Sequence, residues 1–210
     1  MNSISKLVSI SSKAVSSELL SFSKPLNDAL STAIGRELQG MLSERNGFFV
    51  FKQALQVYAS DVSCYPNIAD WNAQDGWRKQ YKDLDRNLIF FAQDIFGVQF
   101  CISEFNVSTF DPETGKIEEI ASSITEWASL ILKDYNYLTG YSLAHDWQVN
   151  HGKLPQGSRL VPKIPFVAGG SFELANLYAL DSKKSMFLRA EIASQIKNLP
   201  DGATIELKTT

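Results

Sequence analysis

Short apolar runs separated by turn-forming residues mark the middle of the chain. The run at 88–92 (Leu-Ile-Phe-Phe-Ala) is continuous, which is typical of a strand that is covered on both faces. Three more strands are predicted after it, at 98–103, 107–110 and 116–120. The sequence Asp-Pro-Glu-Thr-Gly at 111–115 favours a tight turn, because Asp accepts a local amide hydrogen bond, Pro presets φ and Gly adopts the left-handed conformation. The last two strands are therefore predicted to form an antiparallel hairpin.

Two stretches with helical spacing flank these strands. One begins at Pro25, whose missing amide donor costs nothing in a first turn, and continues with apolar residues up to Leu42. The apolar run 48–51 follows it and is predicted to be buried. The other helix begins at Ser123, which forms a capping box with Glu126 and so satisfies amide groups that lack a partner at the helix start.

The last third of the chain repeats the alternation of strands and helices. Pro162 and Pro165 restrict the extended segment 160–166 to an edge strand or an irregular strand. Further strands are predicted at 174–180, 185–189 and 204–208, with a turn at 181–184 and a short helix around Ile192, Ile196 and Leu199. Because short turns join many of the strands, most of the sheet is expected to be antiparallel. The sequence therefore predicts an α+β fold, with a mixed, mainly antiparallel sheet flanked by helices and an N-terminal helical extension.

Residues 1–23 differ in composition from the rest of the chain and are rich in serine. Scattered apolar residues predict a weak amphipathic helix there. Serine competes for backbone hydrogen bonds, so we expect a marginal helix or a partly ordered arm. The chain is therefore divided into a serine-rich N-terminal arm at 1–23 and an α+β domain at 24–210.

The overall composition predicts a globular, cytoplasmic protein. Hydrophobic residues make up 44% of the 210 positions, which is enough to build a core. The formal net charge of -3, with no basic run, argues against nucleic acid as a partner. Cys64 and Cys101 are expected to be reduced structural thiols. The sequence shows neither a signal peptide nor an apolar stretch long enough to span a bilayer.

Motifs that would indicate catalysis or a cofactor do not occur in the sequence, including the phosphate-binding loop, the dinucleotide-binding glycines and the zinc motif HExxH. His145 and His151 are six residues apart, which is not a metal-ligand spacing, and a structural role for His145 is favoured over a general-base pair with Asp146. Asp94 and Asp111 each have a structural explanation in a turn, although a paired-carboxylate hydrolase is an alternative. We therefore predict no catalytic residues, no metal and no cofactor.

Several segments of the chain resemble the SUKH superfamily, and in particular its branch named after the fungal cell-wall assembly regulator. The resemblance is carried by 91–100, by the turn at 110–115 and by the helix that contains Glu126 and Trp127. Further segments are similar to bacterial members in the same order, at 138–141, 159–163, 176–181 and 199–202. The match extends from about residue 46 to residue 208.

The resemblance implies a single α+β domain that works by binding another protein. Bacterial members are typically immunity proteins, which neutralise a toxin domain, often a nuclease, of a polymorphic toxin system. Fungal relatives act as scaffolds in cell-wall signalling. Neither role needs a cofactor, and the family offers no catalytic residues to transfer. We therefore expect a non-catalytic immunity protein; the alternatives are a constitutive scaffold or regulatory module and, thirdly, an enzyme with an unrecognised site.

Candidate partner-binding residues lie between 61 and 85. Trp71, Trp77 and Tyr81 are candidate anchors, because Trp and Tyr are over-represented at binding hot spots. Four acidic residues accompany them and are predicted to steer a basic toxin domain to the site: Asp70, Asp75, Asp83 and Asp85. The alternative is that the aromatic rings fill the edge of the core and that the acids only solvate the surface.

Overall fold

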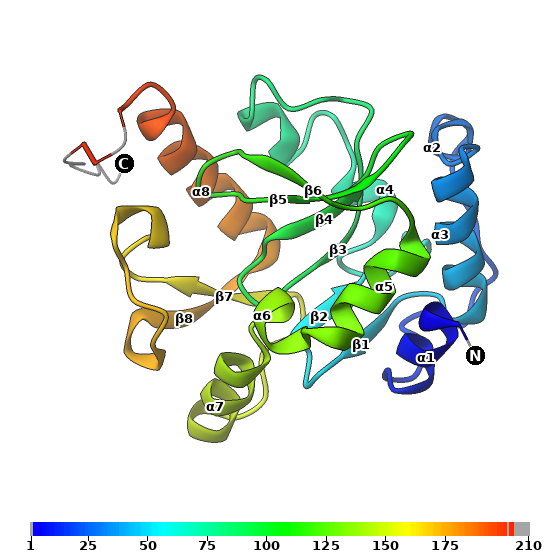
Figure 1. The fold of residues 1–210 in the computed structure, drawn as a ribbon, viewed down its shortest axis with the longest axis horizontal. Helices are drawn as coiled ribbons and strands as arrows, with labels where there is room; N and C mark the ends of the chain where they lie inside the picture. Colours follow the sequence, from blue (N-terminus) through cyan, green and yellow to red (C-terminus); the bar gives the residue numbers. More distant parts are fainter. Residues whose placement is uncertain (1, 201, 204–210) are drawn as a thin grey trace.

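The fold is built around one six-stranded antiparallel sheet (Figure 1). The computed structural model describes residues 2–200 and 202–203. The strands follow each other across the sheet in chain order: β1 (Phe48–Val50), β2 (Leu55–Val57), β3 (Ile89–Gln93), β4 (Gln99–Ile102), β5 (Val107–Phe110) and β6 (Ile117–Ala121). Each strand pairs with its neighbour in an antiparallel register. The predicted strands of the 88–120 region are therefore confirmed.

The predicted turn between β5 and β6 is confirmed in detail. Phe110 and Ile117 face each other across the hairpin, and the Asp111 amide donates to the Lys116 carbonyl at 2.9 Å. Gly115 has a φ of 73°, a conformation that glycine adopts without strain. The local chemistry of the turn thus fixes the register of the hairpin.

Helices cover both faces of the sheet. They are α1 (Ser3–Ser9), α2 (Lys24–Ala29), α3 (Ala33–Glu44), α4 (Ile68–Trp71), α5 (Ile124–Lys133), α6 (Tyr135–Thr139), α7 (Tyr141–His151) and α8 (Ser182–Ile196), with short 3-10 helices η1 (Trp77–Gln80), η2 (Phe166–Ala168) and η3 (Leu174–Asn176). On one face, Trp127 of α5 packs against Phe91 and Phe100. On the other, Trp77 of η1 packs against Phe90 and Phe110. The core therefore lies on both sides of the sheet, and the α+β class is confirmed.

The serine-rich segment is joined to this core. Ile4, Leu7 and Val8 of α1 are buried in the same cluster as α5. After the helix, the Ser12 amide donates to the Phe49 carbonyl and the Val15 amide to the Gly47 carbonyl, both at 2.8 Å. The predicted N-terminal helix is thus present, and its apolar residues contribute to the core that the sheet shares with α5.

The single helix predicted from Pro25 to Leu42 is wrong, because the chain breaks it into α2 and α3. Thr32 caps the second helix by accepting a hydrogen bond from the Gly35 amide at 3.0 Å. A Cβ on Gly35 would lie 2.3 Å from the Leu30 carbonyl oxygen, so the close approach of α3 to the end of α2 requires glycine at this position.

The strand predicted at 185–189 is also wrong, because these residues belong to α8. Asp181 accepts a hydrogen bond from the Lys184 amide at 2.9 Å and caps the helix, so the predicted turn at 181–184 is its first turn. The helix buries Met186 and Ala190 beside the polar Ser185 and Arg189, which interrupts the apolar spacing. The strand predicted at 204–208 lies outside the described residues.

A second, two-stranded sheet forms the far end of the molecule (Figure 1). Strands β7 (Ser158–Pro162) and β8 (Leu177–Asp181) pair antiparallel. A smaller core, which includes Phe96, Trp147 and Leu160, joins this sheet to α7 and to the turn after β3. Among the described residues, no helix combines the length and the apolar character needed to cross a membrane.

Candidate functional site

The three aromatic residues predicted as anchors lie in the core. Trp71 and Trp77 are 2% and 0% exposed, and Tyr81 is 9% exposed. The Trp71 indole donates to the Gln99 side-chain oxygen at 2.8 Å, and the Tyr81 hydroxyl donates to the Pro112 carbonyl at 2.8 Å. Because the polar group of each of these side chains makes a hydrogen bond inside the protein, the whole side chain is buried without an unpaired donor. In this conformation, the rings therefore have almost no surface to offer a partner.

The four predicted acidic residues, Asp70, Asp75, Asp83 and Asp85, are all exposed. Some have local partners: Asp70 accepts from the Asn67 side chain at 2.8 Å, and Asp83 forms an ion pair with Lys197. Surface pairs of this kind add little stability. The steering of a basic partner by these residues stays a prediction.

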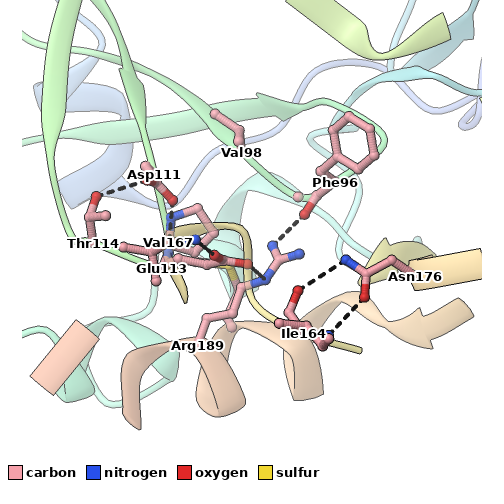
Figure 2. A network of polar contacts seen from close by, with 12 residues as sticks. Phe96, Val98, Asp111, Glu113, Thr114, Ile164, Val167, Asn176 and Arg189 are labelled. Carbon is pink, nitrogen blue, oxygen red and sulfur yellow. Dashed lines mark hydrogen bonds and ion pairs between the residues drawn. The ribbon is translucent and has the colours of Figure 1, made fainter. Parts of the chain in front are cut away.

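The structure presents a different apolar surface, on the connection between β7 and β8. We call residues 163–176 the aromatic loop. Two of its large apolar side chains are exposed, Ile164 at 58% and Phe172 at 61%. The loop is closed at its base by Asn176, whose Oδ1 accepts from the Ile164 amide at 2.9 Å (Figure 2). The Asn176 Nδ2 donates to the carbonyls of Ile164 and Ser171, each at 3.0 Å, so one side chain ties together the two ends of the loop.

Ring contacts fix the exposed Phe172. Its ring stacks on Phe166 with 3.9 Å between centroids and an interplanar angle of 6°. Both rings meet the nearly buried Phe96 edge to face, at 5.5 and 5.7 Å. Since aromatic pairs favour such arrangements, the exposed ring is held in one place by the two rings behind it.

A buried ion pair connects the aromatic loop to the main sheet. Glu113, in the turn between β5 and β6, accepts a hydrogen bond from the Val167 amide at 2.9 Å and lies 3.9 Å from Arg189 Nε (Figure 2). Arg189 also donates to the Phe96 carbonyl. Burial raises the pKa of Glu113 and lowers that of Arg189, and the opposite charge of each partner counters both shifts. The two side chains thus hold the loop, two turns and α8 together.

A surface hollow of about 210 Å³ lies between the aromatic loop and this ion pair. The residues that line it include Phe96, Phe166 and Phe172 and the charged Asp111, Glu113 and Arg189. Asp111 is half-buried; its Oδ1 accepts from the Glu113 amide and its Oδ2 from the Thr114 hydroxyl, both at 2.8 Å (Figure 2). The hollow therefore combines aromatic walls with carboxylates that are fixed in place.

A larger hollow of about 600 Å³ lies between α2, the end of α4 and the ends of β3 and β4. The buried Arg78 lines it, but its guanidinium donates to the Leu88 and Asp85 carbonyls at 3.0 and 2.8 Å. It also lies 5.2 Å over the Phe90 ring. Arg78 therefore has a structural role in tethering these segments, and we place the candidate site at the smaller hollow.

Asp94, His145 and His151 were considered from the sequence for catalysis or metal binding, and each makes contacts that fit a structural role. Burial raises the pKa of Asp94 to about 7. This carboxylate accepts hydrogen bonds from the Phe96 and Val98 amides at 2.8 Å, as its predicted role in a turn requires. His145 stacks on Tyr141, and His151 stacks on Trp147. In the part of the chain that the structure describes, no cluster of ligand residues suitable for a metal occurs.

Sequence reasoning missed the aromatic loop. Its signal in the sequence is weak: Pro165 and the pair Gly169–Gly170 bracket apolar residues in a segment that cannot form a regular strand. The partners that make it rigid come from distant positions, and Asp111 was assigned only its role in the turn. A run of apolar residues between such turn-forming residues is the pattern that a search for exposed loops would need.

Comparisons with known proteins bear on the fold. No family model matches the sequence, and no curated protein matches it. A solved structure, that of Atu4351 from Agrobacterium tumefaciens, is similar over 87% of this chain and 86% of its own, with a TM-score of 0.54 and 12% sequence identity. At this identity the similarity extends to the arrangement of the elements, so the chain shares its fold with Atu4351.

Proposed function

We propose that this chain is a non-catalytic protein-binding domain, and specifically an immunity protein that neutralises a toxin domain of a bacterial polymorphic toxin system. The observation that carries the binding role is the aromatic loop, which exposes Ile164 and Phe172 on a rigid support. The resemblance of the sequence to the SUKH superfamily supplies the immunity role. A constitutive scaffold is the alternative, and the experiment below separates the two.

The physical argument rests on preorganisation. An exposed aromatic side chain that is already fixed loses little conformational entropy when a partner covers it, and most binding energy comes from a few such anchors. Phe172 meets this description because the Phe166 ring and the closed base of the loop hold it while 61% of its surface stays open. The aromatic loop therefore replaces the buried tryptophans as the candidate anchor.

The test compares the full chain with two variants that each remove one exposed phenylalanine. Phe172→Ala removes the candidate anchor; Phe105→Ala is the matched control, because Phe105 is 76% exposed in the turn between β4 and β5. Each tagged protein is used to capture partners from its native lysate. Any toxin domain that is recovered is then co-expressed with each variant in a growth assay. Melting temperatures confirm that all three proteins are folded.

We expect wild type and Phe105→Ala to capture one stoichiometric partner and to restore growth. Phe172→Ala should bind about 30-fold more weakly, as expected for the loss of a hot spot. Equal binding by Phe172→Ala would reject the aromatic loop as the interface. A partner that binds through the loop but is not toxic would contradict the immunity role and favour the scaffold.

A further inference from the structure

We propose that the hollow beside the aromatic loop takes an arginine side chain of the protein partner, an inference that rests on the proposed binding function. The hollow measures about 210 Å³. A cavity of roughly 150 Å³ accommodates benzene, so this space suits one large side chain rather than a whole small-molecule substrate.

The aromatic part of the lining favours a cation with an apolar stem. Phe96, Phe166 and Phe172 all line the hollow, and Phe172 is 61% exposed. A guanidinium placed over an aromatic face gains cation–π attraction, and the methylene groups of an arginine pack against the same rings. A compact ammonium would gain less, because it stacks poorly on flat rings.

The charges of the lining point to the same ligand. Asp111, Glu113 and Arg189 are its charged residues, two carboxylates and one guanidinium, which leaves a formal charge of -1. Arg189 is engaged by Glu113 and by the Phe96 carbonyl (Figure 2). The carboxylate of Asp111 accepts one hydrogen bond at each oxygen and has further lone pairs to accept from a guanidinium.

Other occupants fit less well. An anionic side chain would face Asp111 and Glu113, whereas Arg189, the cation among the described residues that line the hollow, is already paired with Glu113. A neutral apolar side chain would remove water from Asp111 without replacing its hydrogen bonds, which is costly. A basic partner also agrees with the net charge of -3 of the whole chain.

The test uses the full chain and a small probe, so that it does not depend on identifying the partner. Amide signals are followed by NMR during titration with N-acetyl-arginine amide, up to about 100 mM, because single contacts of this kind bind weakly. N-acetyl-citrulline amide, which has nearly the same shape and no charge, is titrated at matched ionic strength. Phe172→Ala and Asp111→Asn are titrated alongside the control Phe105→Ala.

We expect the amides of Asp111, Glu113 and Thr114 and those of 166–172 to shift with the arginine probe, and to shift about fivefold less with the citrulline probe. Both Phe172→Ala and Asp111→Asn should weaken the response by a similar factor, while Phe105→Ala leaves it unchanged. Asp111→Asn keeps one carbonyl oxygen for the Glu113 amide, and unchanged shifts elsewhere in its spectrum show that the turn is intact.

Two results would overturn the inference: no shift in these residues at the highest concentration, or equal shifts with both probes. This failure is distinguishable from failure of the proposed function. If Phe172→Ala loses the partner but the arginine probe causes no shifts, the cation site is rejected and the aromatic loop stands as the interface. Specific binding of the arginine probe by a chain that captures no partner supports the cation site and counts against the immunity role.

Discussion

Replacing Asp94 by asparagine is expected to remove a loss of stability that the wild-type protein undergoes as the pH rises. Asp94 is 6% exposed, and burial raises the pKa of its carboxyl to about 7; hydrogen bonds from the Val98 and Phe96 amides and the charges of Arg189 and Arg159 oppose this shift. The ordinary value is 3.8. The folded state therefore binds a proton at Asp94 more tightly than the unfolded state does.

The sign and the magnitude follow from this difference in pKa. Between the two pKa values the folded state holds the proton and the unfolded state has lost it, so the free energy of unfolding falls as the pH rises. The full effect is on the order of 4 kcal/mol, of which about 2.6 kcal/mol falls between about pH 5 and pH 8. Above the folded pKa the protein carries a buried carboxylate at its full cost.

Asp94→Asn isolates this contribution. Both amide hydrogen bonds, from Phe96 and Val98, are accepted by Oδ1 at 2.8 Å, so the amide oxygen of asparagine retains them while the charge is removed. The assay is urea denaturation of wild type and variant at about pH 5 and pH 8. Titrating groups that are distant from Asp94 and share no partner with it change both proteins alike, so their effects cancel in the difference.

The variant should gain about 2.6 kcal/mol relative to wild type between these two pH values. The comparison uses the change in the difference because any effect of the substitution that does not depend on pH cancels in it. The attraction of Arg159 and Arg189 acts on the ionised carboxylate alone and is already contained in the pKa of about 7. A difference that is the same at both pH values would refute the reasoning. It would mean that the two amide donors and the two arginines keep the carboxyl ionised throughout this range.

Two further predictions concern the core and the aromatic loop. Trp77→Ala should lower the free energy of unfolding by about 3–5 kcal/mol in urea denaturation, as for a buried aromatic side chain; an unchanged midpoint would contradict its place in the core. Asn176→Ala removes the clamp at the base of the loop and should cost about 1–3 kcal/mol. Hydrogen exchange at Ile164 and Val167 should accelerate in this variant, and equal exchange rates would show that other contacts hold the loop.

The central strands and the β5–β6 hairpin could be predicted from the sequence because their signals are local. The run 88–92 needs only its own apolar residues to indicate a covered strand, and Asp111 and Gly115 determine their turn through contacts within five residues. Ser123 is a similar case, since its side chain accepts from the Glu126 amide at 3.0 Å as the capping motif predicts. Elements of this kind can be predicted because the residues that determine them lie close together in the sequence.

The first half of helix α8 was predicted as a turn and a strand because its buried face is partly polar there, whereas the short helix predicted around Ile192 and Ile196 is the second half of α8. Ser185 and Arg189 lie on that face at 1% and 2% exposure, between the apolar Met186 and Ala190. Arg189 is tolerated there because Glu113 and the Phe96 carbonyl lie beside it, and these partners are more than seventy residues away in the chain. Hydrophobic periodicity cannot register a buried cation whose compensation is distant.

The candidate site escaped sequence reasoning for the same reason. Trp and Tyr are enriched at interfaces and also in cores, and what decided between the two here was the position of Gln99 and Pro112, which accept from Trp71 and Tyr81 inside the protein. Phe172 is the opposite case, because its ring stacks on Phe166 while 61% of its surface stays exposed. A binding anchor differs from a core residue in that its packing partners cover only part of its side chain. Which part they cover is decided by residues that are distant in the sequence, so the difference can be seen only in the folded chain.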